Sequence, residues 1–193
     1  ARADAHVEGG RVSGVDAELT LAKWRGATLQ GFLPWLGQVP VLSGTIGAKG
    51  AGDALATSWA LAFDDGGASQ GDVRVDLTRA VIPLQGHVSM RRLDPSLLVN
   101  DRRWHGRASG DVRIEATIDP ARVRASTATV ATDDLAVTLM GYAVERARLK
   151  GAYRANRAHA TGDVAAYGAT ASVRADAELP ESPTVVPSGG ELE

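Results

Sequence analysis

The sequence contains no cysteine, which excludes disulfides, thiolate metal sites and cysteine nucleophiles. Aromatic residues make up only 5% of the 193 positions, so the large side chains that dominate compact cores are scarce. Charge of neither sign prevails, because 21 Lys and Arg residues stand against 23 Asp and Glu residues. Such a balance lacks the positive surface that phosphate backbones require, and we expect no nucleic acid partner.

Long hydrophobic runs are also missing. The longest stretch without charge, residues 27–48, contains two prolines and several polar residues, which disfavour a membrane-spanning helix. We expect neither a transmembrane segment nor a signal peptide in this sequence. The chain opens at Ala1 in the middle of a pattern and closes on Leu-Glu, which resembles a cloning-site remnant. We therefore expect a fragment of a longer protein.

The dominant feature that is present is the alternation of apolar and polar residues. In residues 112–118, Val, Ile and Ala alternate with Arg, Glu and Thr, which is the period of a half-buried strand. The same alternation recurs in residues 15–21, 59–63, 73–77, 135–139 and 173–179. No stretch shows a long helical period. The sequence therefore predicts an all-β protein.

Turn-forming residues separate these runs and predict a largely antiparallel meander. The predicted turns are Glu8-Gly9-Gly10, Asp64-Asp65-Gly66-Gly67, Asp119-Pro120, Asp133-Asp134 and Gly168. Two proline-containing segments, residues 31–36 and 94–99, each predict a short helical turn.

The two helical segments also indicate a degenerate repeat. Each is Leu-rich and is followed by a glycine that opens a strand, Gly44 in one case and Gly106 in the other, an offset of 62 residues. We expect about two to three such repeats in a β-groove segment covering residues 1–180. Residues 181–193, rich in Pro, Ser and Gly, are predicted to form a disordered tail.

Residues with catalytic potential do not form a recognisable constellation. The four histidines are His6, His87, His105 and His159. None has a second histidine or a carboxylate at metal-ligand or dyad spacing within its own element. The paired carboxylates Asp64-Asp65 and Asp133-Asp134 are better explained by turns than by acid and base chemistry. We expect no enzyme activity, no metal and no cofactor.

The apolar strand faces lack amphipathic helices to cover them, so they must meet each other or a ligand. If about a dozen strands continue in one elongated, curved sheet, a spacing of about 4.8 Å between strands makes a trough of roughly 50 to 60 Å. Such a trough suits acyl chains, which are held by apolar contact. The predicted lining residues are Val15, Leu19, Leu21, Trp59, Leu61, Phe63, Val73, Val75, Val112, Ile114, Ile118, Leu135, Val137, Leu139 and Val173.

Several motifs resemble those of the TamB and AsmA-like proteins. They are Leu93–Leu98, Gly106–Ile114, Leu135–Leu139, Leu149–Tyr153 and Gly162–Ala169, within a similarity that spans about residues 25 to 180. The resemblance implies a β-taco fold, an open U-shaped sheet with an apolar interior. It also implies an inner-membrane-anchored protein that crosses the periplasm and moves phospholipid between the inner and outer membranes. The family has no catalytic residues, and its membrane anchor is expected to be absent from this chain.

Two other interpretations remain open. Exposed edge strands could pair with nascent outer-membrane strands, so that the chain acts as a scaffold for barrel assembly alongside a BamA-related barrel protein. Alternatively, the strands could close into a β-sandwich or barrel with a dry core, serving as a spacer or an adhesion module.

Overall fold

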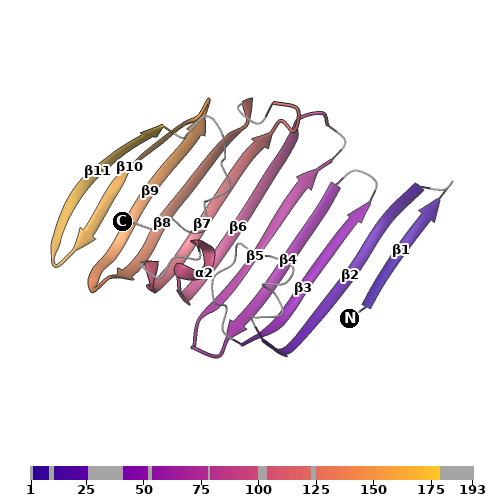
Figure 1. The fold of residues 1–193 in the computed structure, drawn as a ribbon, viewed down its shortest axis with the longest axis horizontal. Helices are drawn as coiled ribbons and strands as arrows, with labels where there is room; N and C mark the ends of the chain where they lie inside the picture. The colour runs from indigo at the N-terminus through magenta and orange to yellow at the C-terminus, as the bar shows by residue number, and fades with distance from the viewer. Residues whose placement is uncertain are drawn as a thin grey trace, which may run out of the picture.

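A computed structural model describes residues 2–8, 11–25, 41–51, 54–77, 79–99, 104–122 and 125–178. Its strands form a single eleven-stranded sheet in which the order in space is the order along the chain (Figure 1). Every neighbouring pair is antiparallel. The predicted all-β meander is confirmed. The closed sandwich or barrel is wrong, because within the described strands β1 pairs only with β2 and β11 only with β10.

The strands are β1 (Arg2–Glu8), β2 (Arg11–Trp24), β3 (Leu42–Ala51), β4 (Ala54–Phe63), β5 (Ala68–Asp76), β6 (Ile82–Leu93), β7 (Gly106–Ile118), β8 (Thr127–Leu139), β9 (Tyr142–Arg154), β10 (Arg157–Ala166) and β11 (Ala169–Glu178). One short helix, α2 (Ser96–Val99), follows β6 and confirms the helical turn predicted in residues 94–99. The other predicted turn, in residues 31–36, lies outside the described residues. No helix in the described part of the chain has the length and apolar character needed to cross a membrane.

Left-handed backbone conformations form the tight hairpin turns. Gly66 and Gly168 have φ of 85° and 75°, so the turns predicted at these glycines are confirmed. Two further turns, at Met140 and Gly141 and at Ala155 and Asn156, were not predicted from the sequence. Neither contains the Asn-Gly or Asp-Gly pair that makes a short hairpin easy to recognise. Of the turn predicted at residues 8–10, residues 9 and 10 lie outside the described part.

The turn predicted at Asp133-Asp134 is wrong. Both residues lie within β8, where the register with β9 shifts between Thr132 and Leu135. A bulge of this kind adds a residue to one strand and leaves it outside the regular pairing. Both carboxylates are exposed and meet arginines of the adjacent strands, Asp133 with Arg113 and Asp134 with Arg146. Two adjacent acidic residues therefore mark a bulge here rather than a reversal.

Two further bulges resemble each other in detail. In β2 the backbone N–H of Lys23 donates to Ser43 Oγ at 3.1 Å, and in β6 the N–H of Arg92 donates to Ser109 Oγ at 2.8 Å. Both bulged residues have a φ of 51°. Aligning the two bulges places Gly44 at the position of Gly110. The predicted repeat instead aligned Gly44 with Gly106, four residues earlier in the chain. A repeat along the whole chain stays a prediction.

The buried core is small. Among the described residues the buried hydrophobic side chains are Leu21, Leu42, Leu93, Leu97, Ala108 and Ala147, and no large side chain is completely enclosed. Four of them flank the bulges of β2 and β6, and Leu97 belongs to α2. The tightest packing therefore lies along one row of strand ends, which is at the bottom of the sheet in Figure 1 and is called the lower edge.

Candidate functional site

The cross-strand register sorts the side chains into two faces. Residues directly opposite each other in an antiparallel pair project to the same side, and alternate residues along a strand project to opposite sides. For example, Leu61 lies opposite Ser69, and Ile114 lies opposite both Gly86 and Val130. Following the partners from β2 to β11 brings together Val15, Leu19, Leu21, Trp59, Leu61, Phe63, Val73, Val75, Val112, Ile114, Ile118, Leu135, Val137, Leu139 and Val173. All predicted groove residues thus share one side, the apolar face.

The apolar face lacks charge. Outside the bulges, none of its described residues between β2 and β11 is ionisable apart from two tyrosines, and its other polar side chains are Thr57, Ser69 and Thr132. Lipid hydrocarbon and this surface are therefore chemically matched, because neither offers hydrogen-bonding or ionic groups along most of its area.

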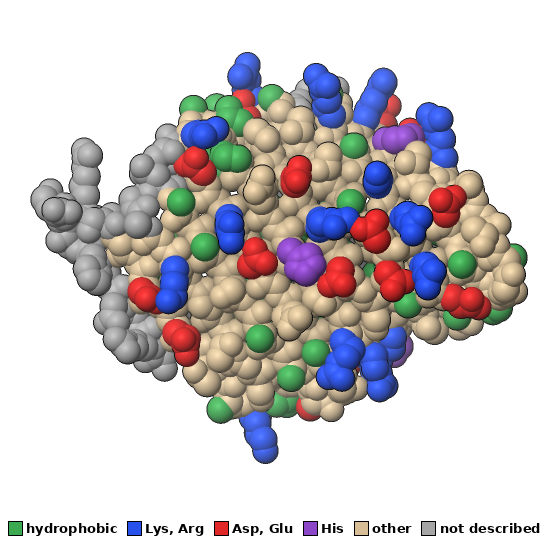
Figure 2. All heavy atoms as spheres, turned by 180° about the vertical axis from the view of Figure 1, so that it is seen from behind, with side chains coloured by type: hydrophobic (Ala, Val, Ile, Leu, Met, Phe, Trp, Pro, Cys, Tyr) green, Lys and Arg blue, Asp and Glu red, His purple; other side chains and the backbone are tan. Residues whose placement is uncertain are grey.

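The opposite side, the polar face, carries the charged residues of the regular strand pairing, and Figure 2 shows acidic, basic and histidine side chains spread across it. Oppositely charged residues of neighbouring strands meet, as in the 3.3 Å ion pair of Lys49 with Asp16. Two histidines also contact aspartates of the next strand, with His87 Nε2 at 3.4 Å from Asp111 and His159 Nδ1 at 2.6 Å from Asp176. Separate strands supply the partners, which is why spacing within one element did not reveal them.

No cluster of three or more His, Cys, Asp or Glu side chains suited to a metal ion occurs in the part of the chain that the structure describes. The histidine and aspartate pairs are instead cross-strand contacts on or beside an exposed surface. The hydrogen bond from His159 lowers the pKa of Asp176 below its usual value, and the hydrogen bond from Arg174 makes a second, smaller contribution in the same direction. These pairs join β10 to β11 and β6 to β7 and need no chemical role.

The apolar face is only partly shielded from solvent. Trp59, Leu61 and Phe63 are half-buried, whereas Val130 and Val173 are exposed. In Figure 1 the only described helix, α2, lies in front of the sheet near its lower edge, on the side away from the view of Figure 2. No second layer of described strands or helices covers the rest of the apolar face.

Trp59 packs against the apolar face over a glycine of the neighbouring strand. Its ring lies over Gly71, the residue directly opposite on β5, and its Nε1–H donates to Ser69 Oγ at 3.1 Å. A Cβ atom on Gly71 would lie 2.6 Å from Cζ2 of the indole, which is too close for any side chain. The glycine therefore lets a large aromatic ring lie flat against the sheet.

Replacing Gly71 with Val should lower the free energy of unfolding by about 1 to 3 kcal/mol, because the added side chain overlaps both the backbone oxygen of His87, 2.4 Å from the new Cβ, and the Trp59 ring. Urea unfolding measures this loss, and near-UV circular dichroism reports the displaced indole. Gly151→Val is the matched control, since a Cβ at this apolar-face glycine meets only atoms at 3.8 Å or beyond. Equal losses in the two variants would contradict the close packing around Gly71, and an unchanged near-UV signal in Gly71→Val would contradict the assigned Trp59 position.

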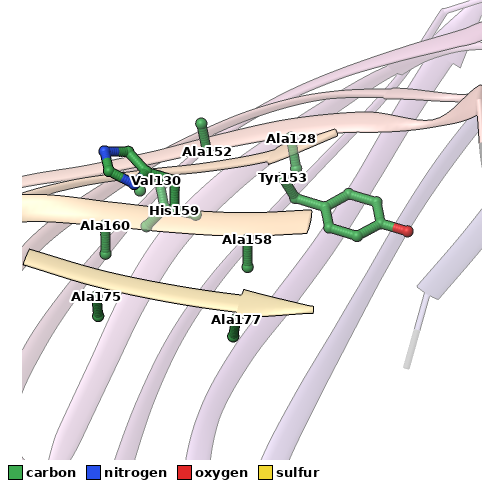
Figure 3. Close-up of a pocket in the computed structure, with 10 residues that line it drawn as sticks. Ala128, Val130, Ala152, Tyr153, Ala158, His159, Ala160, Ala175 and Ala177 are labelled. Atoms are coloured by element: carbon green, nitrogen blue, oxygen red, sulfur yellow. The ribbon is translucent and has the colours of Figure 1, made fainter. Parts of the chain in front are cut away.

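A hollow of about 270 Å³ lies on the apolar face where β8 to β11 meet. Figure 3 shows Ala158, Ala160, Ala175 and Ala177 pointing to one side of the sheet, whereas His159 points to the other. Small side chains on adjacent strands leave this space open. Of the residues in β10 and β11, only Val173 was predicted to line the groove, although the alternating alanines of residues 169–177 carried the same period-two signal.

One buried carboxylate organises the lower edge. Asp94 Oδ1 accepts hydrogen bonds from the backbone N–H groups of Ser96, at 3.0 Å, and Gly106, at 3.3 Å, while Oδ2 lies 2.6 Å from His105 Nδ1. Burial raises the pKa of Asp94, but the hydrogen bonds from Ser96 and Gly106 and the charge of His105 together outweigh burial and lower it. Asp94 thus ties α2 to the first residue of β7.

Comparison with known proteins identifies no relative. No protein-family model, curated protein or solved structure matches the chain. The resemblance to the TamB and AsmA-like proteins stays a prediction, and the candidate site rests on the geometry of the apolar face.

Proposed function

We propose that the apolar face shelters the acyl chains of phospholipids, and that the chain is a segment of a TamB-like or AsmA-like bridge protein. In this proposal the longer protein is anchored in the inner membrane, crosses the periplasm and passes phospholipid to the outer membrane. The observation that carries the proposal is a charge-free face across β2 to β11 with no described layer covering most of it.

The dimensions and chemistry of the sheet support this proposal. The ten strands from β2 to β11, spaced by about 4.8 Å, extend the face over about 43 Å, several times the width of one acyl chain. Apolar contact contributes about 25 cal/mol per Å² and has no preferred direction. A hydrocarbon chain is therefore held on such a face without being fixed at one position, as movement along a bridge requires.

A second candidate function is assistance in the assembly of outer-membrane barrels, with a BamA-related barrel protein as partner. The observation that favours it is the edge at β11, where every side chain is exposed and, among the described strands, hydrogen-bonded pairing is found only with β10. An unpaired strand edge offers backbone donors and acceptors to another strand.

Native mass spectrometry with lipid extraction separates the two proposals. The chain, purified from membranes or incubated with a photo-crosslinkable phospholipid, should carry phospholipid attached to apolar-face residues. Lipid-free protein that cross-links through β11 to barrel strands would contradict the lipid proposal and support the scaffold. Lipid attached mainly to the polar face would contradict the assignment of the apolar face.

A further inference from the structure

Two adjacent hairpin tips at the lower edge of the sheet expose large apolar side chains. Met140, Tyr142 and Tyr167 are 67%, 72% and 70% exposed, the highest values among the large hydrophobic residues that the structure describes. Met140 lies in the turn between β8 and β9, and Tyr167 in the turn between β10 and β11. The backbone N–H of Ala143 donates to the Tyr167 hydroxyl at 3.0 Å, so the two tips touch. We call Met140, Tyr142 and Tyr167 the tip patch.

The backbone at both tips makes these residue types unexpected. Met140 and Tyr167 have φ of 50° and 53°, a left-handed conformation that favours Gly, Asn and Asp and disfavours bulky side chains. The turn at the opposite edge, between β9 and β10, has the same conformation but carries Ala155 and Asn156. Forming such a turn therefore does not require a large apolar residue. The β8–β9 and β10–β11 turns nevertheless both have one.

The tip patch continues the apolar face to the edge of the sheet. Tyr142 lies directly opposite Leu139, and Val144 lies opposite Val137, all on the apolar face. Near the tips Arg146 pairs with Asp134 at 3.2 Å and Arg107, opposite Thr138, pairs with Asp65 at 2.7 Å, while Glu145 adds a negative charge. The surface at the tips is thus apolar and aromatic without an excess of positive charge.

We propose that the tip patch inserts into the interfacial layer of a phospholipid bilayer and forms the edge over which lipid reaches the apolar face. This inference rests on the proposed lipid function. Tyrosine suits the membrane interface because its ring is apolar and its hydroxyl can stay hydrated, and methionine adapts to irregular apolar surroundings. Because the basic residues near the tips are paired, the surface favours a bilayer entered by apolar contact over an acidic protein partner.

The test is partition of the 193-residue chain onto phosphatidylcholine vesicles, measured by flotation. The double variant Met140→Asn with Tyr142→Ser should lower the partition coefficient at least about tenfold, the equivalent of about 1.4 kcal/mol. Binding of the unaltered chain should persist when the salt concentration is raised to about 1 M, because that concentration screens surface charges and leaves apolar contact intact.

Ala155→Asn is the matched control. Asn tolerates the left-handed conformation at both edges, so Met140→Asn and Ala155→Asn should each leave the melting temperature unchanged or raised. Only Met140→Asn should weaken vesicle binding. Equal binding by Met140→Asn and the unaltered chain overturns the proposal, as does self-association through the tips in place of vesicle binding.

The two lipid proposals fail in different ways. A chain that carries phospholipid in native mass spectrometry but does not partition onto vesicles refutes the role of the tip patch alone. A chain that partitions through the tip patch but carries no phospholipid refutes the proposed function of the apolar face.

Discussion

Replacing Ile114 with Asp should strip bound phospholipid from the chain while the sheet stays folded. Ile114 lies midway along β7 on the apolar face, between Gly86 on β6 and Val130 on β8. A carboxylate covered by acyl chains loses its hydration, and without a partner this costs several kcal/mol. In the lipid-free chain the same carboxylate faces the open side of the sheet and stays hydrated. Native mass spectrometry with lipid extraction measures the loss, and circular dichroism checks the fold.

Thr117→Asp is the control for this experiment. Thr117 belongs to the same strand but is exposed on the polar face, where it lies opposite Pro83 and Thr127. The substitution adds the same charge at a site that acyl chains do not reach, so lipid content should match that of the unaltered chain. If both variants retain equal lipid, the apolar face around Ile114 is not where the lipid binds.

Replacing Asp94 with Ala should lower the free energy of unfolding by about 2 to 4 kcal/mol, because two backbone N–H groups lose their acceptor and a charge-assisted contact disappears. The substitution removes the acceptor for Ser96 and Gly106 together with the His105 contact. Asp94→Asn should lose less, since its amide oxygen still accepts a hydrogen bond. Asp134→Ala, which breaks only an exposed ion pair, should cost no more than about 1 kcal/mol.

Acid should reduce the difference in unfolding free energy between the unaltered chain and Asp94→Ala. Folding lowers the pKa of Asp94, so its charged form stabilises the native state above the unfolded pKa of about 3.9. The contribution disappears as the pH falls through the folded-state pKa. Urea unfolding at pH 7 and near pH 3 should therefore show a smaller gap between the unaltered chain and Asp94→Ala at the lower pH. A gap that grows in acid would contradict the assigned contacts.

The faces of the sheet could be predicted from the sequence because a strand's period of two needs no knowledge of its neighbours. Val112 and Ile114 alternate with Arg113 whatever strand lies beside them. Features that depend on register could not be predicted in this way. His159 meets Asp176 only because β10 and β11 pair in one particular alignment.

Local exceptions to regular pairing were equally difficult to predict. Asp133 and Asp134 have the composition of a turn, yet a bulge accommodates both within a continuous strand. The turn at Met140 was not predicted, because a bulky residue occupies a left-handed position that Gly or Asn usually takes. Composition alone does not separate a bulge from a reversal.

The agreement between strand order and chain order has a consequence for how the molecule can vary in size. Because every described strand pairs, within the described part of the chain, only with its predecessor and successor, adding one hairpin at β11 would lengthen the sheet by about 10 Å without altering any contact between described strands. Removing one would shorten it by the same step. The reach of such a molecule is thus a quantity that evolution can adjust hairpin by hairpin, independently of the chemistry of its surface.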